Sequence, residues 1–148
     1  MKHHSPLGTA LSHFLSDTYV LAIKLQYFHW NLTGPEFLTL HPFLGERYES
    51  LTQHIDELAE RMRALGMMAP GTMKAYLALK TIDEAPESVP HAQNLLPILV
   101  SDYDHLIKAA HTLNHLATDA HDEVTADLCL SQQSAYEKVR WMLHSTLS

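Results

Sequence analysis

Residues 28–41 read FHWNLTGPEFLTLH, and the turn in the middle of this stretch organises the fold. Thr33-Gly34-Pro35 interrupts a helical pattern, because glycine readily ends a helix and proline is accepted in the first turn of the next one. Helical spacing of apolar residues is present on both sides of the turn. The stretch therefore predicts two helices that fold back on each other and bring His29 and His41 to the same end of the molecule.

The helix before this turn is expected to start at Ser5-Pro6, with Ser5 as N-cap and Pro6 as first helical residue. Its buried side is predicted from apolar residues at helical spacing, namely Leu11, Phe14, Leu15, Leu21, Ala22, Leu25, Phe28 and Leu32. The helix after the turn has the most regular stripe, made of Phe37, Leu40, Leu44, Tyr48, Leu51, Ile55, Leu58, Met62 and Leu65. Gly66 is the expected end of this second helix.

A long connection follows, from Met67 to about Gln93, with prolines at positions 70, 86 and 90. Within it, Met73 to Leu79 is expected to form a short helix. A connection of this length is typical of a crossover from one end of a helix bundle to the other.

Two more helices are predicted after the connection. The third is expected to start behind Asn94 as N-cap, with Pro97 in its first turn, and to run to about Thr118. The fourth is expected to follow Asp119 and Asp122, which both offer caps. Their buried sides are predicted as Leu99, Leu106, Ala110, Leu113 and Ala117, and as Val124, Leu128, Ala135, Val139, Met142 and Leu143. The sequence therefore predicts one all-α domain, residues 1–148, of four long helices with a short helix in the crossover.

The composition narrows the class of protein. A hydrophobic content of 46% with 18% charged residues excludes a disordered chain. No stretch approaches the ~20 apolar residues of a membrane span, and the first residues lack the pattern of a signal peptide. The single cysteine, Cys129, has no partner for an internal disulfide, which favours a reducing compartment. We therefore expect a cytoplasmic protein.

Histidines and carboxylates mark a candidate metal site. His41, Asp56 and Glu60 lie in one lane beside the apolar stripe of the second helix, and His29 follows Leu25 on the first helix. Each has an ordinary explanation alone, since a histidine on an apolar face is usually packed in the core and exposed acids are usually solvated. Together, imidazole nitrogens and carboxylate oxygens suit ferrous iron with open coordination positions.

The spacing of these residues predicts a site shared by two chains. Asp56 lies fifteen residues after His41, which is roughly 22 Å along a straight helix. The histidines and the acids therefore cannot meet within one chain. They meet between two chains if the second helices pair antiparallel about a two-fold axis near Glu49 and Ser50, which builds two identical sites.

The run FHWNLTGPEFLTLH followed by DELAER (residues 56–61) resembles the signature of the Dps proteins, or miniferritins, of the ferritin-like superfamily. The tail DEVTADLCLSQQSAYEKVRWML (residues 122–143) is similar to the fourth helix of that family, so the resemblance spans nearly the whole chain. Ordinary ferritins place their site inside one bundle with Glu-x-x-His pairs. The sequence contains no such pair, which favours the Dps-like interpretation.

The resemblance implies a ferritin-like four-helix bundle that assembles into a hollow dodecamer of antiparallel dimers, with ferroxidase centres at the dimer interfaces. It implies oxidation of Fe(II) to a ferric mineral stored inside the shell, with iron as the metal and peroxide or dioxygen as the oxidant. His29, His41, Asp56 and Glu60 fall on the family's catalytic and metal-binding positions. Trp30 is then expected beside the centre, although core packing is the alternative for both Trp30 and Trp141.

One position departs from the family pattern. Gly45 stands where the family usually has a carboxylate, four residues after the second histidine. Glu46 is a further metal-ligand candidate, but its side chain is turned by ~100° and reaches the site only if the helix is distorted. We therefore expect that Gly45→Asp tightens iron binding. The alternative is that Gly45 makes room for a close helix contact at the dimer interface.

Two further groups of residues are candidates for metal contact. The resemblance implies an iron-admitting pore near the start of the fourth helix, where Asp122, Glu123 and Asp127 lie; capping is an equal alternative for the first two. His111, His115 and Asp119 form a lane on the third helix with spacing suited to a divalent metal. No family motif covers this lane, and we favour a solvated face for it.

Direct DNA binding is expected to be weak or absent. Family members that compact DNA use lysine-rich tails, whereas this chain carries a net charge of −7 and no basic tail. Iron removal protects DNA without contact. Two other functions remain open: a structural or DNA-associated shell whose centre has decayed, as Gly45 suggests, and a four-helix module without a metal role.

Overall fold

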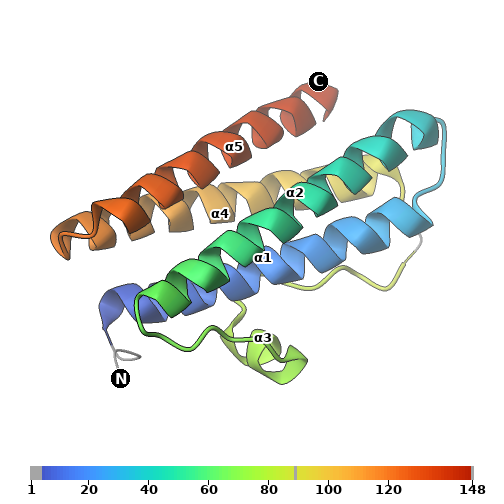
Figure 1. Ribbon diagram of the computed structural model, residues 1–148. Helices are drawn as coiled ribbons and strands as arrows, with labels where there is room; N and C mark the ends of the chain where they lie inside the picture. The colour runs from blue at the N-terminus through green and yellow to red at the C-terminus, as the bar shows by residue number, and fades with distance from the viewer. Residues whose placement is uncertain (1–4, 89, 148) are drawn as a thin grey trace.

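The computed structural model describes residues 5–88 and 90–147 and shows five α-helices. Four are long: α1 (Pro6–Asn31), α2 (Phe37–Ala64), α4 (Ala92–Asp119) and α5 (Glu123–Leu147). The short α3 (Met73–Leu79) has the predicted bounds. The predicted all-α four-helix bundle with a short helix in the crossover is confirmed (Figure 1).

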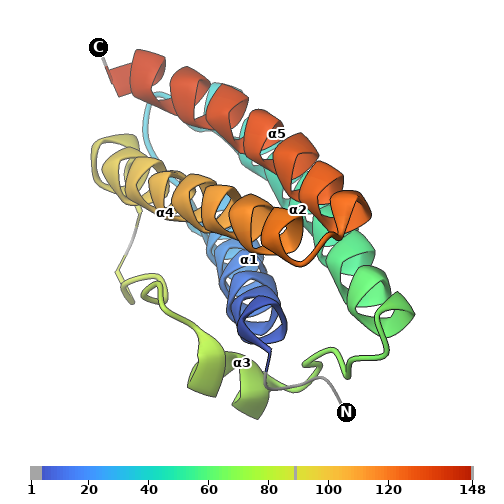
Figure 2. The same ribbon diagram turned by 90° about the vertical axis from the view of Figure 1, so that its left-hand side faces the viewer.

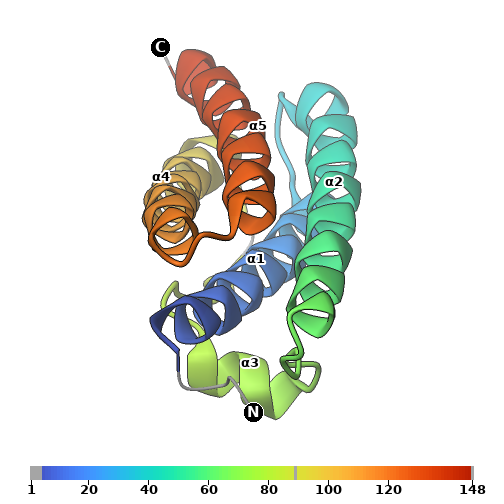
Figure 3. The same ribbon diagram turned by 60° about the vertical axis from the view of Figure 1, so that its left-hand side comes forward.

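The bundle consists of two antiparallel hairpins. One pairs α1 with α2, the other pairs α4 with α5, and α1 packs against α4 between them (Figure 1). The connection after α2 runs back along α1 to the opposite end, where α4 starts, so the predicted crossover is confirmed. Figures 2 and 3 show α3 outside the four long helices, beside the first half of α1. There, Tyr76 of α3 stacks on Tyr19 of α1 with ring centroids 4.2 Å apart.

The helix ends follow local rules, with two corrections. Ser5 caps α1 by accepting a hydrogen bond from Gly8 N, as predicted. Gly66, with φ of +79°, ends α2 as expected, and Met67 N donates to Met62 O. Asp119 is the last residue of α4 rather than a cap of α5, and Asp122 alone caps that helix through Thr125 N.

The start of α4 also differs from the prediction. Asn94 lies inside the helix, His91 is the N-cap, and Pro97 lies beyond the first turn. The backbone before the helix is held by a hydrogen bond from Thr33 N to Pro90 O, which sets His91 in an extended conformation. The His91 carbonyl then accepts from the backbone nitrogens of Asn94 and Leu95. A tertiary contact between the two turns therefore fixes a start that local residue preference had placed later.

The core contains a buried ion pair as well as apolar side chains. Lys24 of α1 lies 2.6 Å from Asp102 of α4, and both side chains are less than a tenth exposed. Lys24 also donates to Asp83 O in the crossover. Burial raises the pKa of Asp102, and the hydrogen bond and charge of Lys24 oppose that rise. The pair thus joins three segments that are distant in the sequence.

Candidate metal centre

His29 and His41 form the most ordered part of the predicted site. They come from the end of α1 and the start of α2, and the turn around Gly34, with φ of +115°, brings them together. Their rings are stacked with centroids 3.9 Å apart and an angle of 8° between planes. Phe37 stacks on the other face of His41, with centroids 4.9 Å apart. The two imidazoles are therefore held as one rigid, half-buried unit.

A reciprocal pair of hydrogen bonds fixes the protonated nitrogen of each ring. His29 Nδ1 lies 2.6 Å from His41 O, and His41 Nδ1 lies 2.8 Å from His29 O. A carbonyl oxygen only accepts, so Nδ1 carries the proton in both rings. Each neutral ring then has its lone pair on Nε2, which is the form that binds a metal ion.

Gly45 makes room for His29. A Cβ atom added at Gly45 would lie 2.9 Å from His29 Cε1 and 3.2 Å from its Nδ1. The space at position 45 is therefore occupied by an imidazole of the same chain. The expectation that Gly45→Asp tightens iron binding is weakened by this finding, because the new side chain must first displace His29 from its hydrogen bond to His41.

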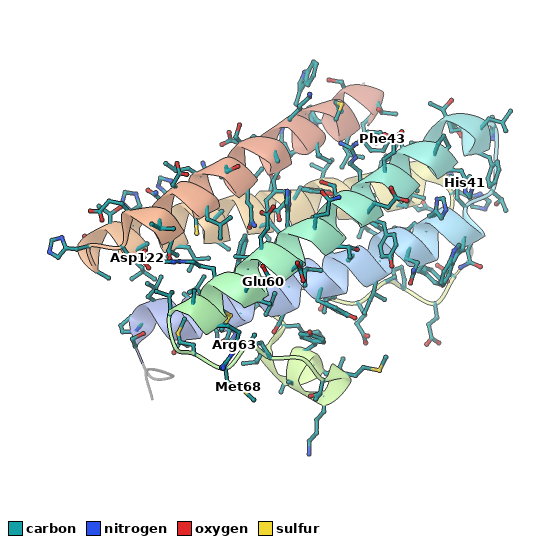
Figure 4. All side chains as sticks on the ribbon, in the orientation of Figure 1. His41, Phe43, Glu60, Arg63, Met68 and Asp122 are labelled. Carbon is teal, nitrogen blue, oxygen red and sulfur yellow. The ribbon has the colours of Figure 1, made fainter. Side chains whose placement is uncertain are left out.

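The acidic residues lie apart from the histidines. Asp56 and Glu60 are exposed on α2, and Figure 4 shows His41 near the start of that helix and Glu60 towards its other end. Among residues 5–88 and 90–147, no three His, Cys, Asp or Glu side chains lie close enough together to hold a metal ion. A single chain thus keeps the candidate nitrogen donors and the candidate oxygen donors at different places along α2.

Glu46 and the two tryptophans lie at the surface of the single chain. Glu46 is exposed and pairs with Arg47 at 3.3 Å, and α2 runs unbroken through position 45, so the distortion that Glu46 needs is absent there. Core packing, the alternative for the two tryptophans, does not occur in the single chain, because Trp30 is 66% exposed and Trp141 is 64% exposed. Such large exposed aromatic surfaces are typical of protein–protein contacts.

The three acids at the start of α5 have different surroundings. Asp122 caps the helix through Thr125 and accepts a hydrogen bond from Arg61 of α2 at 2.7 Å. Partial burial favours its neutral form, but the bonds from Thr125 and Arg61 outweigh this and hold the pKa of Asp122 below its usual value. Glu123 and Asp127 are exposed, so these two are free to attract cations. Capping is therefore the observed role of Asp122.

Sequence reasoning missed a contact between the half-buried His54, two residues before Asp56, and the buried Tyr136. His54 Nδ1 lies 3.0 Å from the hydroxyl of Tyr136, which is buried between α5 and the rest of the core. Burial lowers the pKa of His54, although the charge of Glu57 opposes this, and burial raises the pKa of Tyr136. The sequence signal that could have found this contact is helical spacing, because His54 lies three residues after Leu51 and four before Leu58, both of which are buried.

Comparison with known proteins decides the family. A model of the ferritin-like domain matches residues 8–148. The "DNA protection during starvation protein 2" of Bacillus anthracis is 37% identical over 134 residues, which are 90% of this chain and 91% of that protein. The chain belongs to the Dps-like miniferritins. Membership of this family supports iron binding, iron storage and DNA protection in general.

Solved structures agree with this assignment. The miniferritin superposes on Dps from Bacillus brevis with a TM-score of 0.92 and 34% identity, covering 96% of this chain and 95% of that one. Dps from Vibrio cholerae, described as a member of a broad superfamily of ferritin-like diiron-carboxylate proteins, gives a TM-score of 0.92 and 31% identity, with coverage of 96% and 89%. Within the described part of the miniferritin, no helix is long and apolar enough to cross a membrane.

Proposed function

We propose that this miniferritin oxidises Fe(II) and stores the ferric product inside a hollow shell, and thereby protects DNA from oxidative damage. One observation carries the proposal: the rings of His29 and His41 are fixed by their Nδ1 hydrogen bonds, so that both Nε2 atoms are free to bind a cation. A core-packing role alone does not account for two stacked imidazoles with this shared orientation, each half-buried at the end of a hairpin.

The complete centre is proposed to form between two chains. Antiparallel pairing of α2 with its copy places Asp56 and Glu60 of one chain opposite the histidines of the other, because Glu49 and Ser50 lie about midway between the two sets of donors. The outer face of α2 is available for this contact, since Asp56, Glu60 and Glu49 are exposed. The paired acids supply the negative charge that two neutral imidazoles lack.

In the proposed reaction, ferrous iron is the substrate. The imidazole nitrogens and the carboxylate oxygens bind it and leave coordination positions open for water and the oxidant. Each ferrous ion gives up one electron, and peroxide or dioxygen accepts the electrons and is reduced to the level of water. The ferric ions hydrolyse to the mineral and release protons.

We propose a cytoplasmic dodecamer built from these dimers, as the resemblance to Dps implies. Glu123 and Asp127, with Asp122 behind them, are proposed to line the iron-admitting pores. Direct DNA contact is not part of the proposal, because a net charge of −7 gives a phosphate backbone little to bind. Removal of ferrous iron and peroxide protects DNA at a distance.

Oxidation kinetics on the pure protein test the activity. Ferrous iron is added without oxygen, and peroxide or, separately, dioxygen is then admitted. We expect faster oxidation than in protein-free buffer, and a loss of roughly tenfold or more in His29→Ala and in Asp56→Ala with assembly unchanged. His121→Asn and Glu87→Ala are the controls, because they alter an exposed histidine and an exposed acid elsewhere on the chain, and both should keep the wild-type rate.

A second candidate function is a shell with an inactive centre, and Gly45 is the observation that favours it. The family's carboxylate is absent at this position, and His29 fills the space. In that case the assembled wild-type protein oxidises iron no faster than buffer, and His29→Ala changes nothing. Either result decides between the two functions.

A further inference from the structure

His111 and His115 form a second pair of imidazoles, far along the chain from the proposed iron site. They lie one turn apart on α4, and both are exposed. Their Nε2 atoms are 3.1 Å apart, with ring centroids separated by 4.6 Å and planes at 84°. The two Nε2 atoms thus lie next to each other at the surface of the helix.

This separation suits a shared metal ion. Two nitrogens that bind one zinc ion at about 2.0–2.1 Å lie about 3.3 Å apart at the tetrahedral angle and about 2.9 Å apart at a right angle. The observed 3.1 Å falls between these limits. Histidines four residues apart on a helix bind zinc in the same way in metalloproteases, because both side chains are on one face.

We propose that His111 and His115 form a surface site for one divalent transition-metal ion of the zinc class. The helix holds both donors before the ion arrives, so little conformational entropy is lost on binding. Asp119 is exposed one turn further along the lane, but the described residues do not bring three such donors together, so water completes the coordination. The site does not depend on the proposed ferroxidase activity.

The ordinary alternative is a hydrogen bond between the two rings, with one Nε2 protonated and the other accepting. Such a bond between exposed side chains contributes little to stability, since water competes for both nitrogens. Zinc binding therefore needs to displace only this weak bond. The alternative predicts no zinc site that depends on both residues.

Zinc titration of the assembled full chain tests the proposal. Binding is measured calorimetrically in the His29→Ala background, which weakens the proposed iron site as a competitor. We expect His111→Gln and His115→Gln each to remove one zinc ion per chain. A spacing control combines Thr112→His with His115→Gln, which keeps two exposed imidazoles but turns them ~100° apart around the helix. This control should lose the same ion.

The outcomes distinguish the proposed zinc site at His111 and His115 from the proposed iron site at His29 and His41. Equal zinc stoichiometry in the parent and in His111→Gln overturns the proposal, and so does retention of the ion by the spacing control, which would indicate unspecific binding to surface histidines. In the otherwise unaltered chain, His111→Gln should oxidise ferrous iron at the wild-type rate. If oxidation is absent from every protein but the zinc difference persists, the proposed function fails and this inference stands.

Discussion

Gly45 lies against the ring of His29, so closely that a single added Cβ atom would come within 2.9 Å of Cε1. His29 has little freedom to move away, because its Nδ1 is bonded to His41 O and its ring is stacked on His41. The residue that departs from the family pattern is therefore part of the arrangement that positions a proposed ligand.

We predict that Gly45→Ala slows ferrous oxidation by roughly tenfold. The added Cβ atom displaces the His29 imidazole, and the loss of a contact that orients a metal ligand typically lowers activity by this much. The change in stability should be small, because the gain of about 1 kcal/mol for alanine over glycine in a helix interior offsets part of the cost of moving the His29 ring from its contacts with His41. Single-turnover kinetics and denaturant unfolding measure the two effects. Gly71→Ala is the control, because a Cβ there has no neighbour within 4 Å. A Gly45→Ala protein with the wild-type rate would contradict this role.

We predict that Lys24→Met destabilises the protein by about 3–5 kcal/mol, because it leaves the buried Asp102 carboxylate without its cation. The loss should shrink as the pH falls, since burial already raises the pKa of Asp102 and a protonated carboxyl needs no partner. Lys108→Met removes an exposed lysine and serves as the control. Adding Asp102→Leu to Lys24→Met should recover much of the loss; equal instability of the single and double variants would argue against an unpaired charge as the cause.

We predict that Asp122 and Asp127, both near the start of α5, have different roles. Asp127→Asn should slow oxidation at limiting iron and leave unfolding within about 0.5 kcal/mol of the wild type, as for an exposed residue. Asp122→Ala should lower stability by about 1 kcal/mol, because the helix loses its cap. Glu137→Gln, further along α5, is the control for charge. Wild-type iron uptake by Asp127→Asn would remove that residue from the proposed pore.

We predict that His54 makes the free energy of unfolding depend on pH. Burial lowers its pKa in the folded chain, so the unfolded chain binds a proton first as the pH falls below about 6.5, and stability declines there. His54→Gln should flatten this decline, by at most about 1.4 kcal/mol per pH unit. Unfolding at fixed chain concentration from pH 8 to 5 measures the slope. An equally steep slope in His54→Gln would contradict the prediction.

Most of the helices could be predicted from the sequence, because the residues that start and end them lie next to each other in the chain. Ser5-Pro6 and Gly66 fix helix ends through their own backbone preferences, and Gly34 makes the turn between α1 and α2 possible in the same way. The segment from Met73 to Leu79 forms the short helix that was predicted for it. The start of α4 was misplaced because it depends on a bond between Thr33 and Pro90, which no local pattern contains.

The sequence also predicted part of the candidate site, but not the contacts between its side chains. Proximity of His29 and His41 followed from the turn between them, and the separation of Asp56 from His41 followed from helix geometry. The contact between Gly45 and the His29 ring depends on a side-chain rotamer and on the close approach of two helices, so it required coordinates. Core packing stayed open as an alternative for Trp30 for a related reason, because one sequence does not distinguish a core residue from an interface residue.

The central claim is that each iron site takes its histidines from one chain and its acids from another. Co-expression of His29→Ala and Asp56→Ala chains with different tags tests it most directly. In a mixed dimer, one site carries both changes and the other carries neither, so random pairing leaves about a quarter of the sites intact. We predict that the mixed assemblies recover about a quarter of the wild-type oxidation rate, while each variant alone is nearly inactive. Mixed assemblies that are no more active than the separate variants would contradict a site shared between chains.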